Sequence, residues 1–294
     1  MSLPQSFLSA IYINFCIIKS IMNPIALFNQ IRPMNCFLAA IGVFVGYSAA
    51  TATISLPFML ILAMLTAFSI TAAGNLINDY FDLEIDVKLG KKSALVKGKI
   101  TPKELKIFTF ILFAFGIAGA FFINLTALGI AIITALLLIT YSAAMRKRKY
   151  IGNWIVALGT SLTLIYGAAI TLNFDLVAFF AASAFFANVA REIIKDAEDI
   201  KGDIGLKKTL PMILSFGLVK TIVLAMYGAA VITAAAAWAL GKVKGPYYII
   251  LLVLSTALFF RSWDLLTKRK LGSAQEMSKR GMIVALIAFL AAAI

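Results

Sequence analysis

Long apolar runs separated by short polar segments follow one another along the chain. Each is about 20 residues long, the length that an α-helix needs to cross the hydrocarbon core of a bilayer. Only Ser55, Leu56 and Pro57 mark the hinge between the first two runs, and one fused helix would be longer than a span requires. The pattern predicts nine transmembrane helices in an all-α, polytopic membrane protein. The runs lie at roughly 34–55, 56–77, 106–124, 126–145, 152–172, 174–194, 218–240, 246–264 and 281–294.

The segment before the first run has a different character. Its apolar stretch, 7–18, is too short to span a membrane, and no basic segment precedes it as in a signal peptide. We interpret residues 1–33 as an interfacial segment that lies on the membrane, and residues 34–294 as a single transmembrane domain.

Composition and charge agree with a membrane protein. Hydrophobic residues make up 62% of the chain and charged residues 14%, with a mean hydropathy of +0.97, which excludes an ordinary soluble domain. Lysine and arginine gather after the second, fourth, sixth and eighth runs, so the positive-inside rule predicts a multi-pass cell-membrane protein with a cytoplasmic N-terminus and an outside C-terminus. This distribution explains the net charge of +14 without nucleic acid, and no protein partner is implied.

Nine of the 13 acidic residues fall in two clusters, each at the predicted cytoplasmic end of a span. The first cluster reads NDYFDLEID and places Asn78, Asp82 and Asp86 on one helical stripe, with Asp79 beside it. The second reads REIIKDAEDIKGD, and its acids share a face by steps of three and four residues. These acids are Glu192, Asp196, Asp199 and Asp203.

Such spacing brings like charges together near a membrane boundary, where carboxylates are costly unless a cation compensates them. Mg²⁺ prefers carboxylate, water and phosphate oxygens, and proteins commonly bind it through a few carboxylates together with substrate phosphates. We therefore predict that the two clusters bind a diphosphate between them through Mg²⁺. The predicted metal ligands are Asn78, Asp79, Asp82, Asp86, Asp196, Asp199 and Asp203.

These motifs resemble those of the UbiA superfamily of intramembrane prenyltransferases. The pattern Asn-Asp-x-x-Asp-x-x-x-Asp of that superfamily is matched by residues 78–86, and its second aspartate motif by Asp196, Asp199 and Asp203. The resemblance covers nearly the whole chain and implies nine helices around a central cavity, with Mg²⁺ as cofactor. It also points to Tyr141 as a catalytic residue beside Asp82, Asp86, Asp199 and Asp203, although the Tyr-x-x-x-Lys pattern of the family has Met145 at its last position here.

Within the superfamily, IRPMNC at 31–36 and the second acidic motif followed by KTLP are most similar to the archaeal digeranylgeranylglyceryl phosphate synthases. This resemblance implies geranylgeranyl diphosphate as the prenyl donor and a lipid phosphate, geranylgeranylglyceryl phosphate, as the acceptor. The product would carry the second ether bond of archaeal membrane lipids. Expected substrate-binding residues are Arg32, Asn35, Lys91, Arg146, Lys147, Arg191 and Lys195.

Two alternatives remain open at this point. An aromatic prenyltransferase that acts on a quinone precursor would use the same diphosphate chemistry with a different acceptor. A transporter with intramembrane acids is the more distant alternative, because transporter acids usually lie near the midplane of the membrane at broken helices.

Overall fold

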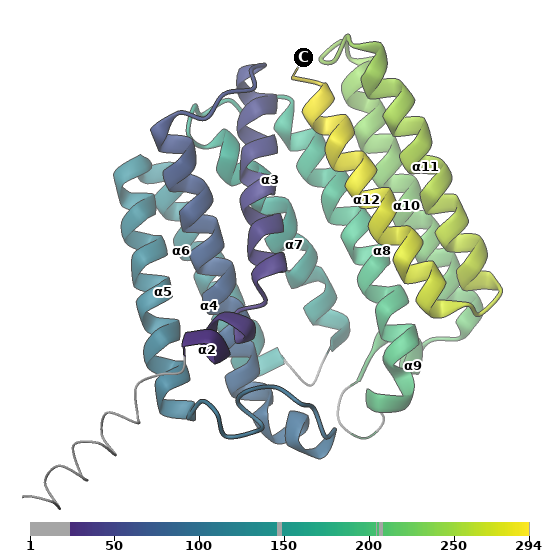
Figure 1. Cartoon of the computed structure of the whole chain (residues 1–294). Coiled ribbons are helices and arrows are strands. Elements are labelled where there is room, and N and C mark those ends of the chain that lie inside the picture. Colours follow the sequence, from purple (N-terminus) through teal and green to yellow (C-terminus); the bar gives the residue numbers. More distant parts are fainter. Residues whose placement is uncertain (1–23, 146–148, 204, 206–207, 294) are drawn as a thin grey trace, which may run out of the picture.

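The computed structural model describes residues 24–293 except 146–148, 204, 206 and 207, and only the backbone of 145, 149 and 201–203. The described part is a bundle of long antiparallel helices (Figure 1). Its elements are α2 (Pro24–Gln30), α3 (Pro33–Thr51), α4 (Phe58–Lys88), α5 (Pro102–Ile123), α6 (Leu125–Thr140), the π-helical turn η1 (Tyr141–Met145), α7 (Lys149–Ala168), α8 (Val177–Asp203), α9 (Leu210–Ile213), α10 (Phe216–Ala239), α11 (Pro246–Thr267) and α12 (Leu271–Ala291).

Local signals in the sequence explain where several helices begin. Proline stands in the first turn of α3, α5 and α11, where its missing N–H costs no intrahelical hydrogen bond. Thr101 and Glu104 form a reciprocal capping box at the start of α5. Asn124 accepts a hydrogen bond from the Ala127 N–H at the start of α6 and donates to the Ala169 carbonyl, which ties this turn to the end of α7.

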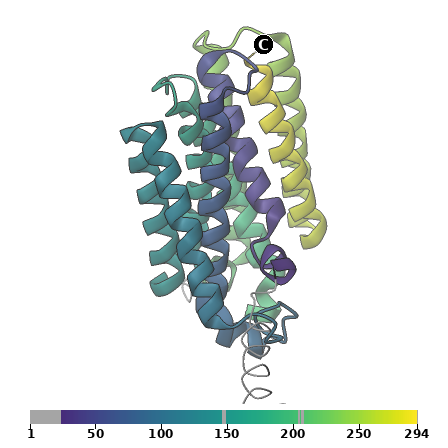
Figure 2. The same cartoon turned by 60° about the vertical axis from the view of Figure 1, so that its left-hand side comes forward.

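Eight of the described helices are long and apolar enough to cross a membrane: α3, α4, α5, α6 with its π-helical turn, α7, α8, α10 and α11. Large apolar side chains such as Phe110, Phe122 and Ile232 lie on their outer surfaces, where lipid replaces water. The molecule is thus an integral membrane protein built from helices. In the bundle, α3 packs against α4 and α7, and α8 packs against α7, α10 and α12 (Figures 1 and 2).

The predicted hinge at 55–57 is confirmed, because α3 ends at Thr51 and α4 begins at Phe58. The prediction of nine spans is confirmed only for eight of them in the described part of the chain. The ninth long helix, α12, begins ten residues before the predicted run at 281 and carries Glu276, Lys279 and Arg280 in this added portion. These charged residues lower the hydropathy of α12, so this helix matches a membrane span in length but not in composition.

Two helices extend well beyond their apolar runs. The predicted run at 56–77 continues as helix to Lys88, and the run at 174–194 continues to Asp203. Intrahelical hydrogen bonds hold these polar turns, and hydropathy does not detect them. Both acidic clusters therefore lie on helices and not in loops.

Candidate active site

The first acidic cluster occupies the last three turns of α4. Asp82 and Asp86 are only 4% and 5% exposed. They lie one or two turns beyond the apolar part of the helix. The side-chain amide of Asn78 donates to Asp82 Oδ2 at 3.4 Å. Helical spacing thus places one amide and two buried carboxylates along a single face of α4.

The loop after α4 returns a cation to this cluster. Lys91 Nζ lies 2.7 Å from Asp86 Oδ1. The backbone N–H of Lys91 also donates to the Asp86 carbonyl, so the turn itself brings the lysine back over the helix end. A buried carboxylate needs such a cation, because the loss of hydration costs several kcal/mol per ion.

Asp79, on the neighbouring face of α4, is held by the segment that joins α2 to α3. Arg32 binds its Oδ1 and the Gln30 amide donates to its Oδ2, each at 2.5 Å. Asp79 is 4% exposed, and both of its oxygens have a protein partner. The cation of Arg32 compensates the charge of this buried carboxylate.

The second acidic cluster lies on the last turns of α8. Glu192 and Asp196 are buried, whereas Asp199 is exposed. The side-chain amide of Asn153, on α7, donates to Asp196 Oδ2 at 2.7 Å. The backbone of Asp203 belongs to α8, and its side chain lies outside the described residues.

Basic side chains accompany this cluster as well. Arg191 Nη1 lies 2.5 Å from Glu192 Oε1, and Lys195 Nζ lies 3.8 Å from Glu192 Oε2. Arg191 also donates to the Asn188 amide oxygen at 3.3 Å. Both acidic clusters therefore combine buried carboxylates with cations that are partly exposed.

The two clusters lie at the same end of the bundle. Helices α4 and α8 run in the same direction, and their C-terminal ends lie on the lower side of Figure 1. In the described part of the chain, no three acidic, cysteine or histidine side chains are close enough to hold a metal ion by themselves. A cation bound at either helix end would therefore need further oxygen ligands from water or phosphate.

The remaining predicted residues are placed as follows. Tyr141 begins the π-helical turn after α6, and its ring packs so closely on Gly152 of α7 that a Cβ there would lie 2.3 Å from it. Asn35 is exposed in the first turn of α3. Arg146 and Lys147 lie outside the described residues.

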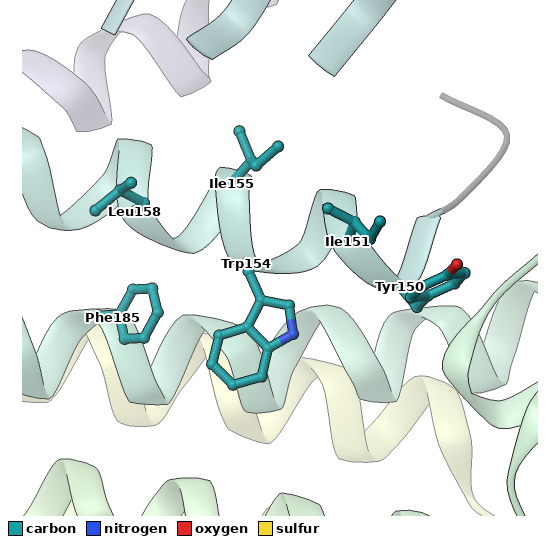
Figure 3. A pocket seen from close by; sticks show the side chains of 6 residues that line it. All are labelled: Tyr150, Ile151, Trp154, Ile155, Leu158 and Phe185. Atoms are coloured by element: carbon teal, nitrogen blue, oxygen red, sulfur yellow. The ribbon is translucent and has the colours of Figure 1, made fainter. Parts of the chain in front are cut away.

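A pocket of about 330 Å³ opens between α7 and α8 (Figure 3). It is lined by apolar and aromatic side chains, namely Tyr150, Ile151, Trp154, Ile155, Leu158 and Phe185. Trp154 projects from α7 toward α8, where it packs on Phe185. This lining suits hydrocarbon and offers little to a phosphate. The predicted central cavity remains a prediction.

Sequence reasoning missed three amides that hold the carboxylates and the chain around them. Gln30 binds Asp79, Asn153 binds Asp196, and Asn75 donates to the Ile31 carbonyl at 2.7 Å. For Asn75 and Asn153 a signal was available, because a polar amide within an apolar span is costly unless it has a partner.

Comparison with known proteins agrees with this architecture. Residues 39–291 match the model of the UbiA prenyltransferase family. The digeranylgeranylglyceryl phosphate synthase of Methanopyrus kandleri is 33% identical over 268 residues, which cover 88% of this chain and 96% of that protein. The synthase of Pyrococcus horikoshii is 33% identical over 277 residues, with 93% and 99% covered.

Solved structures show the same fold. A structure described as giving insights into the biosynthesis of digeranylgeranylglyceryl phosphate synthase in membranes superposes with a TM-score of 0.78 at 31% identity, covering 92% of this chain and 98% of that one. A UbiA homologue from Archaeoglobus fulgidus bound to GPP and Mg²⁺ gives 0.68 at 20% identity, with 90% and 99% covered. The family match and the long alignments lead to one conclusion: this chain belongs to the UbiA prenyltransferase family.

Proposed function

We propose that this protein transfers a geranylgeranyl group from geranylgeranyl diphosphate to geranylgeranylglyceryl phosphate. The observation that carries the proposal is the pair of acidic helix ends, α4 and α8, at one end of an apolar bundle. The choice of acceptor is supported by relatives of that name, which align over nearly their whole length. The related structure bound to GPP and Mg²⁺ supports a diphosphate and a metal in this fold.

The donor set fits magnesium. The two helix ends offer carboxylate and amide oxygens, and the chain has no histidine at all. Asn78, Asp82 and Asp86 would hold Mg²⁺ on α4, and Asp196, Asp199 and Asp203 would do so on α8. When bound, Mg²⁺ neutralises the charge that develops on the departing diphosphate, an effect worth several kcal/mol. Asp79 was also predicted as a ligand, and it would bind the metal beside its contacts to Gln30 and Arg32.

Basic residues next to the carboxylates would bind the phosphate oxygens. Lys91, Arg191 and Lys195 each already lie beside an acidic side chain of one cluster. Hydrogen bonds between charged partners are about twice as strong as neutral ones, so these cations favour the charged diphosphate. Arg32, Asn35, Arg146 and Lys147 complete the proposed substrate-binding set.

The transfer breaks the bond between the allylic C1 and the diphosphate oxygen and forms an ether bond to the acceptor hydroxyl. The hydroxyl proton passes to the diphosphate or to an aspartate, because no histidine is available as a base. The ring of Tyr141 would stabilise the allylic cation by about 0.5 to 2 kcal/mol.

We further propose that both acidic helix ends face the cytoplasm. The lysine-rich loop after α4 and the basic turn after α11 lie at that end of the bundle, as the positive-inside rule requires. Residues 1–33 would then lie at the cytoplasmic interface, and 34–294 would form a single transmembrane prenyltransferase domain.

An acceptor competition tests this function. The purified protein receives geranylgeranyl diphosphate and Mg²⁺ with equal amounts of geranylgeranylglyceryl phosphate and 4-hydroxybenzoate, and the prenylated products are identified by mass spectrometry. We expect the ether lipid alone. Prenylated 4-hydroxybenzoate as the main product would assign the protein to the aromatic prenyltransferases instead.

A further inference from the structure

Side chains of α4 bind three consecutive residues at the junction of α2 and α3, namely Gln30, Ile31 and Arg32. Asn75 donates to the Ile31 carbonyl at 2.7 Å, and Asp79 binds both Arg32 and Gln30. Asn75 and Asp79 are four residues apart, so they lie one above the other on the same face of α4. These contacts stabilise an unfavourable backbone conformation at Arg32, which has φ 56° and precedes a proline.

Gln30 makes a second contact, to the loop that follows α4. Its side-chain Oε1 accepts a hydrogen bond from the backbone N–H of Ala94, at 3.2 Å. Gln30 is 6% exposed, and its chain neighbour Ile31 belongs to an apolar cluster with Leu27, Leu95 and Ile100. A single buried amide thus joins Asp79 on α4 to a loop that follows the helix.

The joined loop, residues 89–101, carries the lysine of the first cluster. Leu95 and Ile100 anchor it in the apolar cluster, and the Lys99 N–H donates to the Ala94 carbonyl at 2.9 Å. Lys91 stands at its start, 2.7 Å from Asp86. The hydrogen bond from the Ala94 N–H to Gln30 therefore adds a second tie, three residues beyond Lys91, to the turn that the Lys91 N–H forms with the Asp86 carbonyl.

We infer that Gln30 is a positioning residue, which locks loop 89–101 onto α4 through Asp79 and so holds Lys91 over the site of the diphosphate. Asp79 then serves as the anchor of this lock, with Arg32 on one of its oxygens and Gln30 on the other. The part that concerns the diphosphate rests on the proposed function. The lock between Gln30, Asp79 and Ala94 does not.

Two substitutions separate packing from hydrogen bonding. Gln30→Met keeps the length and volume of the side chain and removes both hydrogen bonds. Gln30→Lys keeps a donor toward Asp79 and removes the acceptor for the Ala94 N–H. Gln275→Met, on α12, is the matched control for the substitution itself.

The first readout is the rate at which trypsin cleaves the folded protein after the lysines of loop 89–101, compared with cleavage at Lys268–Lys270 in the same sample. Loss of one hydrogen bond predicts cleavage of the loop about fivefold to tenfold faster in Gln30→Met and in Gln30→Lys, with unchanged cleavage at the reference site. Gln275→Met should match the wild-type protein at both sites.

The second readout is steady-state kinetics with the prenyl diphosphate. We expect both Gln30 variants to raise KM for the donor by about fivefold and to change kcat less than twofold, because Lys91 loses its position while the carboxylates keep theirs. If the protein shows no prenyl transfer at all, the proposed function fails, and the cleavage rates still decide on the lock.

Three results would overturn the inference. Wild-type cleavage of the loop in Gln30→Met would show that the loop does not depend on this amide. Faster cleavage at both sites in Gln30→Met would indicate general destabilisation instead of a lock. If Gln30→Lys behaves as wild type while Gln30→Met does not, the contact with Asp79 alone matters and the link to Ala94 is refuted.

Discussion

At the scale of single residues, the buried carboxylates of α4 are the proposed metal ligands. Replacing Asp82 by Asn keeps the shape of the side chain and removes its charge, so the proposed Mg²⁺ site would lose an anionic ligand. We expect kcat for prenyl transfer to fall by about 100-fold or more, as several kcal/mol of stabilisation by a metal implies. The measurement is turnover of purified protein at saturating donor.

Glu84→Gln is the matched control for this change. Glu84 lies two residues from Asp82 on the same helix, and its side chain is exposed. This variant should keep turnover within about twofold of wild type, because surface substitutions of this kind have small effects. Equal losses in Asp82→Asn and Glu84→Gln would mean that the charge of the helix end matters and not a metal ligand.

Residue types and spacing selected Asp82, Asp86 and Asp196 as candidate metal ligands, since a carboxylate at the end of an apolar run is costly without a function. The structure buries all three. Contacts between residues far apart in the sequence were not accessible in the same way. Asn153 lies 43 positions from Asp196, and Gln30 lies 64 positions from Ala94. Only the packing of the helices brings such residues together, and no local pattern records it.

At the scale of helices, α3 and α7 approach each other closely where they cross. A Cβ at Gly46 would lie 2.0 Å from the Leu164 carbonyl oxygen, and one at Gly167 would lie 2.1 Å from the Val43 carbonyl oxygen. Both obstacles are backbone atoms, which cannot rotate away. Each glycine is therefore required by a close approach of two main chains.

Gly46→Ala should consequently lower the thermal stability of the detergent-solubilised protein. We expect a loss of at least about 1–3 kcal/mol, the usual cost of overpacking. Gly159→Ala on α7 is the control, because nothing lies within 4 Å of the added Cβ, and alanine should there stabilise the helix by up to about 1 kcal/mol. A Gly46→Ala protein as stable as wild type would refute the close crossing.

Helix positions could be predicted from hydropathy, and helix ends could not. The hinge before Phe58 was accessible because a proline marks it. Hydropathy alone does not detect the final turns of α4 and α8, because polar residues that continue a helix have the composition of a loop. The helical spacing of their acidic residues predicted these turns instead. The start of α12 was missed, because Glu276, Lys279 and Arg280 lower the hydropathy of its first half.

At the scale of the whole molecule, the distribution of charge predicts one orientation in the membrane. Lys97, in the loop after α4, and Lys244, between α10 and α11, are both exposed, and an odd number of spans separates them. In a variant without the native cysteines Cys16 and Cys36, an impermeant maleimide added to intact cells should label Lys244→Cys and not Lys97→Cys. The opposite labelling would show that the orientation is the reverse of the one proposed, and that the donor enters from the other side of the membrane.

Prenyl transfer through Mg²⁺ is measured as product formation by the purified protein from geranylgeranyl diphosphate and geranylgeranylglyceryl phosphate, with Mg²⁺, with EDTA, and with Mg²⁺ restored after EDTA. Two oxygen-rich helix ends that act through magnesium predict ether lipid in the first and third reactions and none in the second. Undiminished product in EDTA would contradict the role assigned to the two acidic clusters, and absence of product in all three reactions would contradict the function itself.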